Sequence, residues 1–252
     1  MVNLPEQNEF TSYLFSSLEK NGLHEFSSDT TLAQKLYELT CQMLTVNEHM
    51  NLTTITSPED IIVRHYVDSL SVAAHIPDGS NVLDLGCGAG FPCLPLALAR
   101  PDLHITAVDS TEKKVRYVEQ TATLLGIPSD RFCALSLRAE QGGAPGGQLR
   151  EKFNIVVSRA VARLCVLGEL ALPCLKVGGT LIAPKGARAE EELAEAQGLT
   201  ALGAGEFRLL ATPLAYPDRE DVERHALVMI GKQEKTPKIY PRKYAQILKK
   251  PL

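Results

Sequence analysis

The 252-residue sequence predicts an α/β fold with a mostly parallel, doubly wound sheet. Three observations carry this prediction. Short β-branched runs alternate with helical ones from residue 81 onward. The first of these runs leads into the glycine-rich turn "GCGAG". Near the end, "EFRLLATPLAYP" and "RHALVMIGK" follow each other with no helical run between them, which predicts a terminal antiparallel hairpin.

The periodicity predicts individual elements. Apolar residues recur at helical spacing between residues 5 and 45, Ser28 or Asp29 can cap the second helix, and Pro58 begins a further one. Strands are expected at Asn81–Leu85, His104–Asp109, Phe132–Leu137, Asn154–Ser158 and Thr180–Pro184. The helices between them are expected at Cys93–Ala99, Thr111–Leu125, Leu164–Leu172 and Glu190–Gln197.

Three regions follow from these patterns. Residues 1–78 are expected to form a helical extension packed on the main domain, which spans residues 79–231. Residues 232–252 are rich in Lys, Arg and Pro and poor in apolar residues, which predicts an extended or partly ordered basic arm.

Composition limits the possible functions. The formal net charge of −4 excludes a global field that attracts nucleic acid, so RNA contacts would need locally clustered basic residues. The six cysteines form no C-x-x-C pair and no zinc-like cluster, which predicts reduced, structural thiols and no metal. The first residues lack the order of a signal peptide, and no apolar run approaches the about 20 residues of a bilayer span. We expect a cytoplasmic, monomeric protein without a membrane partner.

The glycine turn discriminates between ligands. Gly86, Gly88 and Gly90 allow a ligand to approach the backbone closely, but their G-x-G-x-G spacing departs from the G-x-G-x-x-G of dinucleotide sites. Pro92 removes an amide donor that a pyrophosphate would use at the helix start. Asp84, just before the glycines, suits a cationic ligand group better than a phosphate.

Asp109 closes the second strand and is placed to accept hydrogen bonds from ribose hydroxyls. NAD and S-adenosylmethionine sites share this feature. Together with the turn and the terminal hairpin, it favours a nucleoside ligand without phosphate, S-adenosylmethionine, over a dinucleotide.

Several segments resemble the bacterial small-subunit ribosomal RNA guanine-N7 methyltransferases, the glucose-inhibited division protein B family. These are "NEHMNLTTITSPEDIIVRHYVDSL", "VLDLGCGAGFPCLPLALARPDLHITAVDSTEKKVRYVE", "LRAE", "VSRAVARL", "PKG" and "ERHALVMI". The resemblance implies a class I (Rossmann-like) methyltransferase fold, S-adenosylmethionine as cofactor, and as target a guanine in the 530 loop of 16S rRNA, free or in the small ribosomal subunit. The sequence departs from the family pattern at Cys87, at Cys93 and in the tail.

The resemblance also implies roles for individual residues. It places Gly86 and Phe91 in the first cofactor turn, Ala139 and Glu140 around the adenine, and Arg159 beside the cofactor and the target base. It further implies that Asp109, Ser110 and Thr111 form the ribose-binding end of the second strand.

Each assignment has a structural alternative. Phe91 could be a core aromatic, Glu140 a solvated carboxylate, and Arg159 the partner of Asp84 or Asp109 in an ion pair.

Four basic residues are candidate RNA contacts. Arg64 and His65 could equally form a structural network in which Asp68 pairs with both, since it lies one helical turn away. Lys185 and Arg224 could equally be solvated surface charges.

The implied chemistry needs no general base, because N7 of guanine carries a lone pair and no proton. We therefore assign no proton-abstracting residue and give Arg159 a positioning role. A methyltransferase for another RNA or a small molecule, a dehydrogenase, and a non-catalytic RNA-binding factor are the alternatives.

Overall fold

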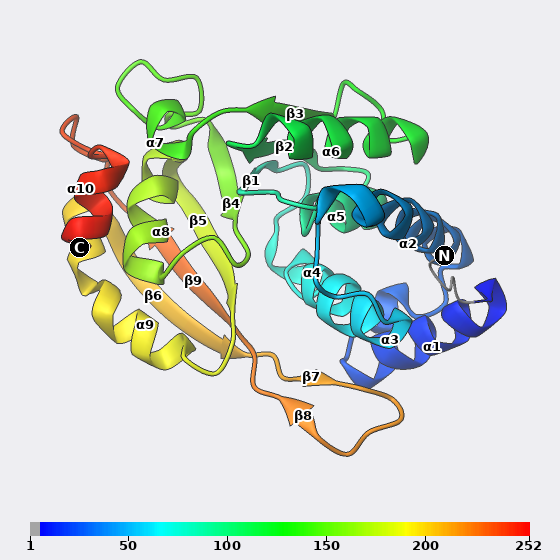
Figure 1. The fold of residues 1–252 in the computed structure, drawn as a ribbon. Helices are drawn as coiled ribbons and strands as arrows, with labels where there is room; N and C mark the ends of the chain where they lie inside the picture. The colour runs from blue at the N-terminus through cyan, green and yellow to red at the C-terminus, as the bar shows by residue number, and fades with distance from the viewer. Residues whose placement is uncertain (1–5) are drawn as a thin grey trace.

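The computed structural model describes residues 6–252 and contains a seven-stranded sheet in the order β3-β2-β1-β4-β5-β9-β6 (Figure 1). Its strands are β1 Asn81–Leu85, β2 His104–Asp109, β3 Phe132–Ser136, β4 Phe153–Val157, β5 Leu175–Lys185, β6 Ala204–Ala211 and β9 Ala226–Lys232. The first five run parallel, and β9 lies antiparallel between β5 and β6. The α/β fold and the terminal antiparallel pair are confirmed. The short strands β7 (Leu214–Ala215) and β8 (Val222–Glu223) form a separate ribbon.

Helices cover both faces of the sheet. The main-domain helices are α5 Cys93–Ala99, α6 Glu112–Leu124, α7 Ala139–Gly142, α8 Leu164–Ala171 and α9 Ala189–Glu195. Successive strand residues enter different apolar clusters: Val82 packs with the N-terminal helices, α5 and α6, whereas Leu83 packs with α8 and α9. This burial on both faces explains why the parallel strands read as continuous apolar runs.

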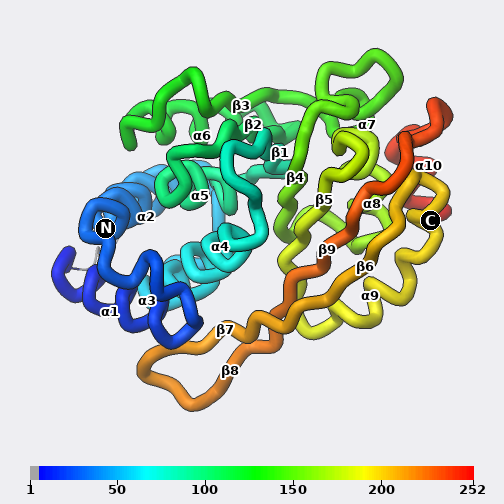
Figure 2. The backbone as a smooth tube through the Cα atoms, turned by 180° about the vertical axis from the view of Figure 1, so that it is seen from behind, coloured from blue at the N-terminus to red at the C-terminus, as the bar shows by residue number. Residues whose placement is uncertain are grey.

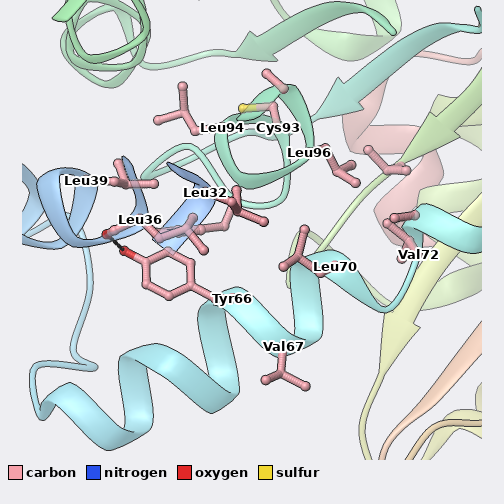
Figure 3. Packing of buried hydrophobic residues seen from close by; sticks show 14 of the residues in the cluster. Leu32, Leu36, Leu39, Tyr66, Val67, Leu70, Val72, Cys93, Leu94 and Leu96 are labelled. Carbon is pink, nitrogen blue, oxygen red and sulfur yellow. Dashed lines mark hydrogen bonds between the residues drawn. The ribbon is translucent and has the colours of Figure 1, made fainter. Parts of the chain in front are cut away.

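The N-terminal helices pack against α5. They are α1 Gln7–Lys20, α2 Thr30–Met50, α3 Pro58–Ile61, the π-helical turn η2 Ile62–Val67, and α4 Asp68–Leu70. Asp29 caps α2, where its Oδ1 accepts from Leu32 N at 2.9 Å. Figure 3 shows Tyr66 among the leucines of α2 near α5, with its hydroxyl 3.0 Å from Leu36 O. The helix predicted from Pro58 is therefore present, but its middle is π-helical.

Composition predicts an extended or partly ordered basic arm for the C-terminal segment, whereas the structure places a helix in it. Figures 1 and 2 place helix α10 (Tyr244–Lys249) beside α8. Lys232 is the last residue of β9 and is buried, and its Nζ donates to Leu172 O and Leu175 O at 2.9 and 2.7 Å. Lys232 therefore satisfies carbonyls of the domain, which composition alone does not reveal.

Candidate active site

A cavity of about 1140 Å³ opens at the carboxyl ends of β1, β2, β4 and β5. Ligands bind at this edge in open parallel sheets. Eleven of the fourteen candidate residues line it: Gly86, Gly88, Phe91, Asp109, Ser110, Ala139, Glu140, Arg159, Arg64, His65 and Lys185. The other three described candidates, Gly90, Thr111 and Arg224, lie outside its lining.

The three glycines of the turn have different roles. All have positive φ, at +83° for Gly86, +54° for Gly88 and +92° for Gly90. A Cβ on Gly90 would lie 2.4 Å from Leu94 Cδ1, so this glycine serves helix packing. A Cβ on Gly88 would have only Gly86 O, at 3.9 Å, within 4 Å among the described atoms. The turn thus leaves an open cradle at Gly88, on the cavity side.

Asp109 fixes this turn and faces the cavity. Its Oδ2 accepts from Gly88 N at 3.1 Å, and its Oδ1 accepts from Thr111 N at 2.8 Å. The side chain is only partly buried, so lone pairs of the carboxylate remain available to a diol. Thr111 contributes through its backbone, at the start of α6.

Asp84 does not reach the cavity, contrary to the expectation that it faces a cationic ligand. It is fully buried, and its Oδ2 accepts from Cys93 N at 3.1 Å. Burial raises the pKa of Asp84 to about 7. The side chain therefore ties β1 to α5 and belongs to the core.

Arg159 is held by three groups at the polar end of the cavity. Its Nη1 donates to Arg64 O at 2.7 Å and to Asp68 Oδ2 at 3.0 Å, and its Nη2 lies 2.9 Å from His65 Nδ1. The ion pair considered with Asp84 or Asp109 is wrong, because the carboxylate partner is Asp68. His225 Nε2 lies 2.9 Å from Asp68 Oδ1 on the other side.

The alternative in which Asp68 pairs directly with Arg64 and His65 is also wrong, although Arg159 joins the three residues in one network. Arg64 pairs with Glu223 at 2.6 Å. His65 is buried, and burial followed by the charge of Arg159 lowers its pKa to about 3. Since a guanidinium only donates, His65 Nδ1 accepts, and the Nε2 proton faces Thr53 Oγ1 at 3.1 Å. His65 is therefore a neutral imidazole.

Phe91 is both a core residue and a cavity wall. It is 3% exposed, and its ring stacks on that of His65 with centroids 4.2 Å apart and planes 11° from parallel. The Arg159 Cζ lies 5.2 Å from the Phe91 centroid. Phe91 is thus a core aromatic residue whose ring also lines the cavity.

The basic candidates at the rim differ in their freedom. Lys185 Nζ pairs with Glu192 at 2.8 Å and donates to Ala162 O at 2.7 Å, so its charge is already satisfied. Arg224 is exposed. It lies beside the cavity rim, because its carbonyl oxygen is 4.0 Å from the Cβ position of the cavity-lining Gly186.

Among the lining residues that sequence reasoning did not assign to the site are Thr53, Asp68, His225 and Tyr244. The only signal for His225 was its place before the last strand, at the edge where the other strand ends gather. Within residues 6–252, no helix has the length and apolar character of a bilayer span. The same residues contain no group of three or more His, Cys, Asp or Glu side chains suited to a metal ion.

Comparison with known proteins decides the family. The model of the GidB family, rRNA small subunit methyltransferase G, matches residues 32–210. The chain belongs to this family. A ribosomal RNA small subunit methyltransferase G from Desulforamulus reducens is 37% identical over 97% of this chain and 99% of its own length. The protein of that name from Bacillus cereus strain B4264 is 41% identical over 90% of this chain and 92% of its own. The resemblance inferred from the motifs is confirmed.

Solved structures agree on the fold. A SAM-dependent O-methyltransferase from Thermotoga maritima aligns with a TM-score of 0.53 at 15% identity, over 77% of this chain and 72% of its own. The [4+2]-cyclase SpnF aligns with a TM-score of 0.54 at 16% identity, over 79% and 94% of the two chains. At such identities these likenesses show the class I fold alone. Through its family, this chain is a methyltransferase whose methyl donor is S-adenosylmethionine.

Proposed function

We propose that this protein transfers the methyl group of S-adenosylmethionine to N7 of a guanine in the 530 loop of 16S rRNA. The observation that carries the proposal is the match to rRNA small subunit methyltransferase G over most of the chain. The cavity supports it, because a nucleoside-binding edge and a charged end meet in one space.

The residues present fit the cofactor. Asp109 would accept hydrogen bonds from the ribose hydroxyls, and the open cradle at Gly88 leaves room for a ligand against the backbone. Ala139 and Glu140 would border the adenine, with the Glu140 carboxylate as acceptor for its amino group. When bound, S-adenosylmethionine supplies an electrophilic methyl group on a sulfonium.

The polar end suits a reaction that makes the base cationic. Methylated N7 leaves a positive charge on the guanine ring, which an unbalanced cation beside the ring would oppose. Asp68 compensates the charge of Arg159, and His65 is neutral. Arg159 can therefore position the cofactor carboxylate, a phosphate or a base oxygen without adding net charge. Rate acceleration then rests on alignment, which contributes about 7–11 kcal/mol in favourable cases.

The partner in this proposal is small-subunit ribosomal RNA, as the free molecule or within the subunit, and the chain works as a monomer in the cytoplasm. Presentation of the N7 edge requires an unpaired or loop guanine, because a stacked helix hides the edge in a deep groove.

The test uses purified protein, methyl-tritiated S-adenosylmethionine and small-subunit RNA or subunits that lack the modification. Nuclease digestion and nucleoside chromatography should place the label in 7-methylguanosine. Arg159→Ala should lose most activity at saturating cofactor and RNA. Label in another nucleoside, or none despite cofactor binding, would overturn the proposed acceptor.

A further inference from the structure

The C-terminal segment reaches the apolar end of the active-site cavity. Tyr244, the first residue of α10, lines the same cavity as Leu137, Ala139, Ala162 and Leu170. We propose that the segment 232–252 completes the cofactor site and that the Tyr244 ring forms the outer wall of its adenine end. This inference rests on the cofactor placement of the proposed function.

A buried ion pair fixes the segment just before Tyr244. Glu169 is fully buried on the apolar helix α8, and its Oε1 accepts from Arg242 N at 2.9 Å and Arg242 Nε at 2.8 Å. Its Oε2 accepts from Arg242 Nη2. A buried carboxylate is costly unless it is paired and hydrogen-bonded, and Arg242 provides both. The next residue of α8, Leu170, lines the cavity. The ion pair of Glu169 with Arg242 thus joins the C-terminal segment to the cavity wall.

A second anchor holds the preceding turn. Arg150 Nη1 donates to Gly143 O at 2.8 Å and Tyr240 O at 2.9 Å, and its Nη2 donates to Thr236 O at 2.7 Å. The guanidinium therefore connects the loop after α7 to the tail at two points. With both anchors in place, Tyr244 is presented by a rigid element, which positions a ligand-contacting ring better than a loose arm would.

The two ends of the cavity differ in chemistry, and this difference indicates where the adenine of the cofactor binds. The end near Phe91 is filled by the ion pair of Arg159 with Asp68, which suits charged ligand groups. Leu137, Ala139 and Tyr244 line the cavity and pack against the apolar cluster of α8, whereas Phe91 belongs to the other cluster. In the sheet order, β2 with Asp109 lies between β3, which leads to Leu137, and β4, which leads to Arg159. A planar adenine belongs at the apolar end, next to a ribose at Asp109. Tyr244 is only partly buried, so its ring retains surface for such a contact.

Calorimetric titration with S-adenosylmethionine and with 5′-methylthioadenosine tests the proposal. The second ligand keeps the adenosine but lacks the amino-acid end. Tyr244→Ala should raise the Kd of both ligands by about tenfold, since a lost aromatic contact to a base has this size. Tyr244→Phe should bind as the wild type does. Leu248→Ala is the matched control, because Leu248 lies on the same helix and is 53% exposed.

Several outcomes would overturn the proposal. Unchanged affinity of Tyr244→Ala would do so, as would a loss seen with S-adenosylmethionine but absent with 5′-methylthioadenosine. If the alanine variant fails to fold, Tyr244→Leu keeps apolar packing against α8 and should still lose affinity for both ligands. Asp109→Ala distinguishes a failure of the Tyr244 inference from a failure of the cofactor placement. If it weakens binding while the Tyr244 variants bind normally, only the tail inference fails; if it too binds normally, the cofactor placement fails.

Discussion

At the scale of single residues, Asp68 provides the negative charge at the polar end of the cavity. Its carboxylate is buried between Arg159 and His225. Burial by itself raises the pKa of Asp68, but the hydrogen bonds and charges of these two partners outweigh it and hold the pKa below its ordinary value. The folded protein thus binds the proton of Asp68 less tightly than the unfolded chain does.

Asp68→Asn should lower the free energy of unfolding at pH 7 by about 3–5 kcal/mol, because it leaves the half-buried Arg159 without its counter-charge. The wild-type advantage is present above the unfolded pKa of about 3.9 and is lost as pH falls through the lower folded pKa. Urea unfolding at pH 7 and pH 3 should therefore show a large difference that shrinks in acid. Asp221→Asn, at an exposed position, is the control. A pH-independent difference would contradict the ion-pair account.

For Asp84 we predict the opposite dependence of stability on pH. Its folded pKa of about 7 lies above the unfolded value of about 3.9, so wild-type stability should fall as pH rises between them. The integrated effect is about 4 kcal/mol. Asp84→Asn keeps an oxygen for Cys93 N and removes the titration. Unfolding free energies measured from pH 4 to pH 8 should decline for the wild type relative to the variant, and parallel curves would contradict a buried, protonated Asp84.

At the scale of elements, the glycine turn separates packing from binding. Gly90→Ala forces a Cβ against Leu94 and should destabilise the protein by about 1–3 kcal/mol. Gly88→Ala meets open space and should cost about 1 kcal/mol of backbone strain. Its methyl group enters the cofactor cradle, however, so the Kd for S-adenosylmethionine should rise at least about tenfold, or 1.4 kcal/mol. Thermal melts and calorimetry on both variants check this, and equal losses of affinity would contradict the division.

The elements also show what the sequence can predict. The parallel strands followed from apolar runs, because burial on both faces leaves a continuous pattern. The position of β9 between β5 and β6 could not follow, since pairing order is set by long-range contacts. The π-helical turn η2 could not be predicted from the sequence either. It brings Arg64 O and His65 Nδ1 within hydrogen-bond distance of the Arg159 guanidinium. The motifs predicted candidate residues, most of which line one cavity, whereas their hydrogen-bond and ion-pair partners depended on tertiary packing.

At the scale of the whole molecule, acidic residues neutralise much of the basic charge around the cavity. Glu192 pairs with Lys185, Glu195 with Arg163, and Glu223 with Arg64. The acidic helix α9 thus supplies ion-pair partners to basic residues of the rim through Glu192 and Glu195. A molecule with a net charge of −4 that binds RNA must rely on the few cations that remain free.

Arg224 is such a cation. It is exposed at the rim, next to the cavity-lining His225, and within residues 6–252 it makes no ion pair. If it contacts an RNA phosphate, Arg224→Ala should weaken binding to small-subunit RNA and reduce the slope of log Kobs against log salt by about 0.7–0.9. Arg208→Ala removes the same charge from β6, where the side chain pairs with Glu206, and should leave the slope unchanged. Filter binding across a salt series measures both slopes. Equal slopes for Arg224→Ala and the wild type would mean that RNA approaches the cavity from a side that Arg224 does not face.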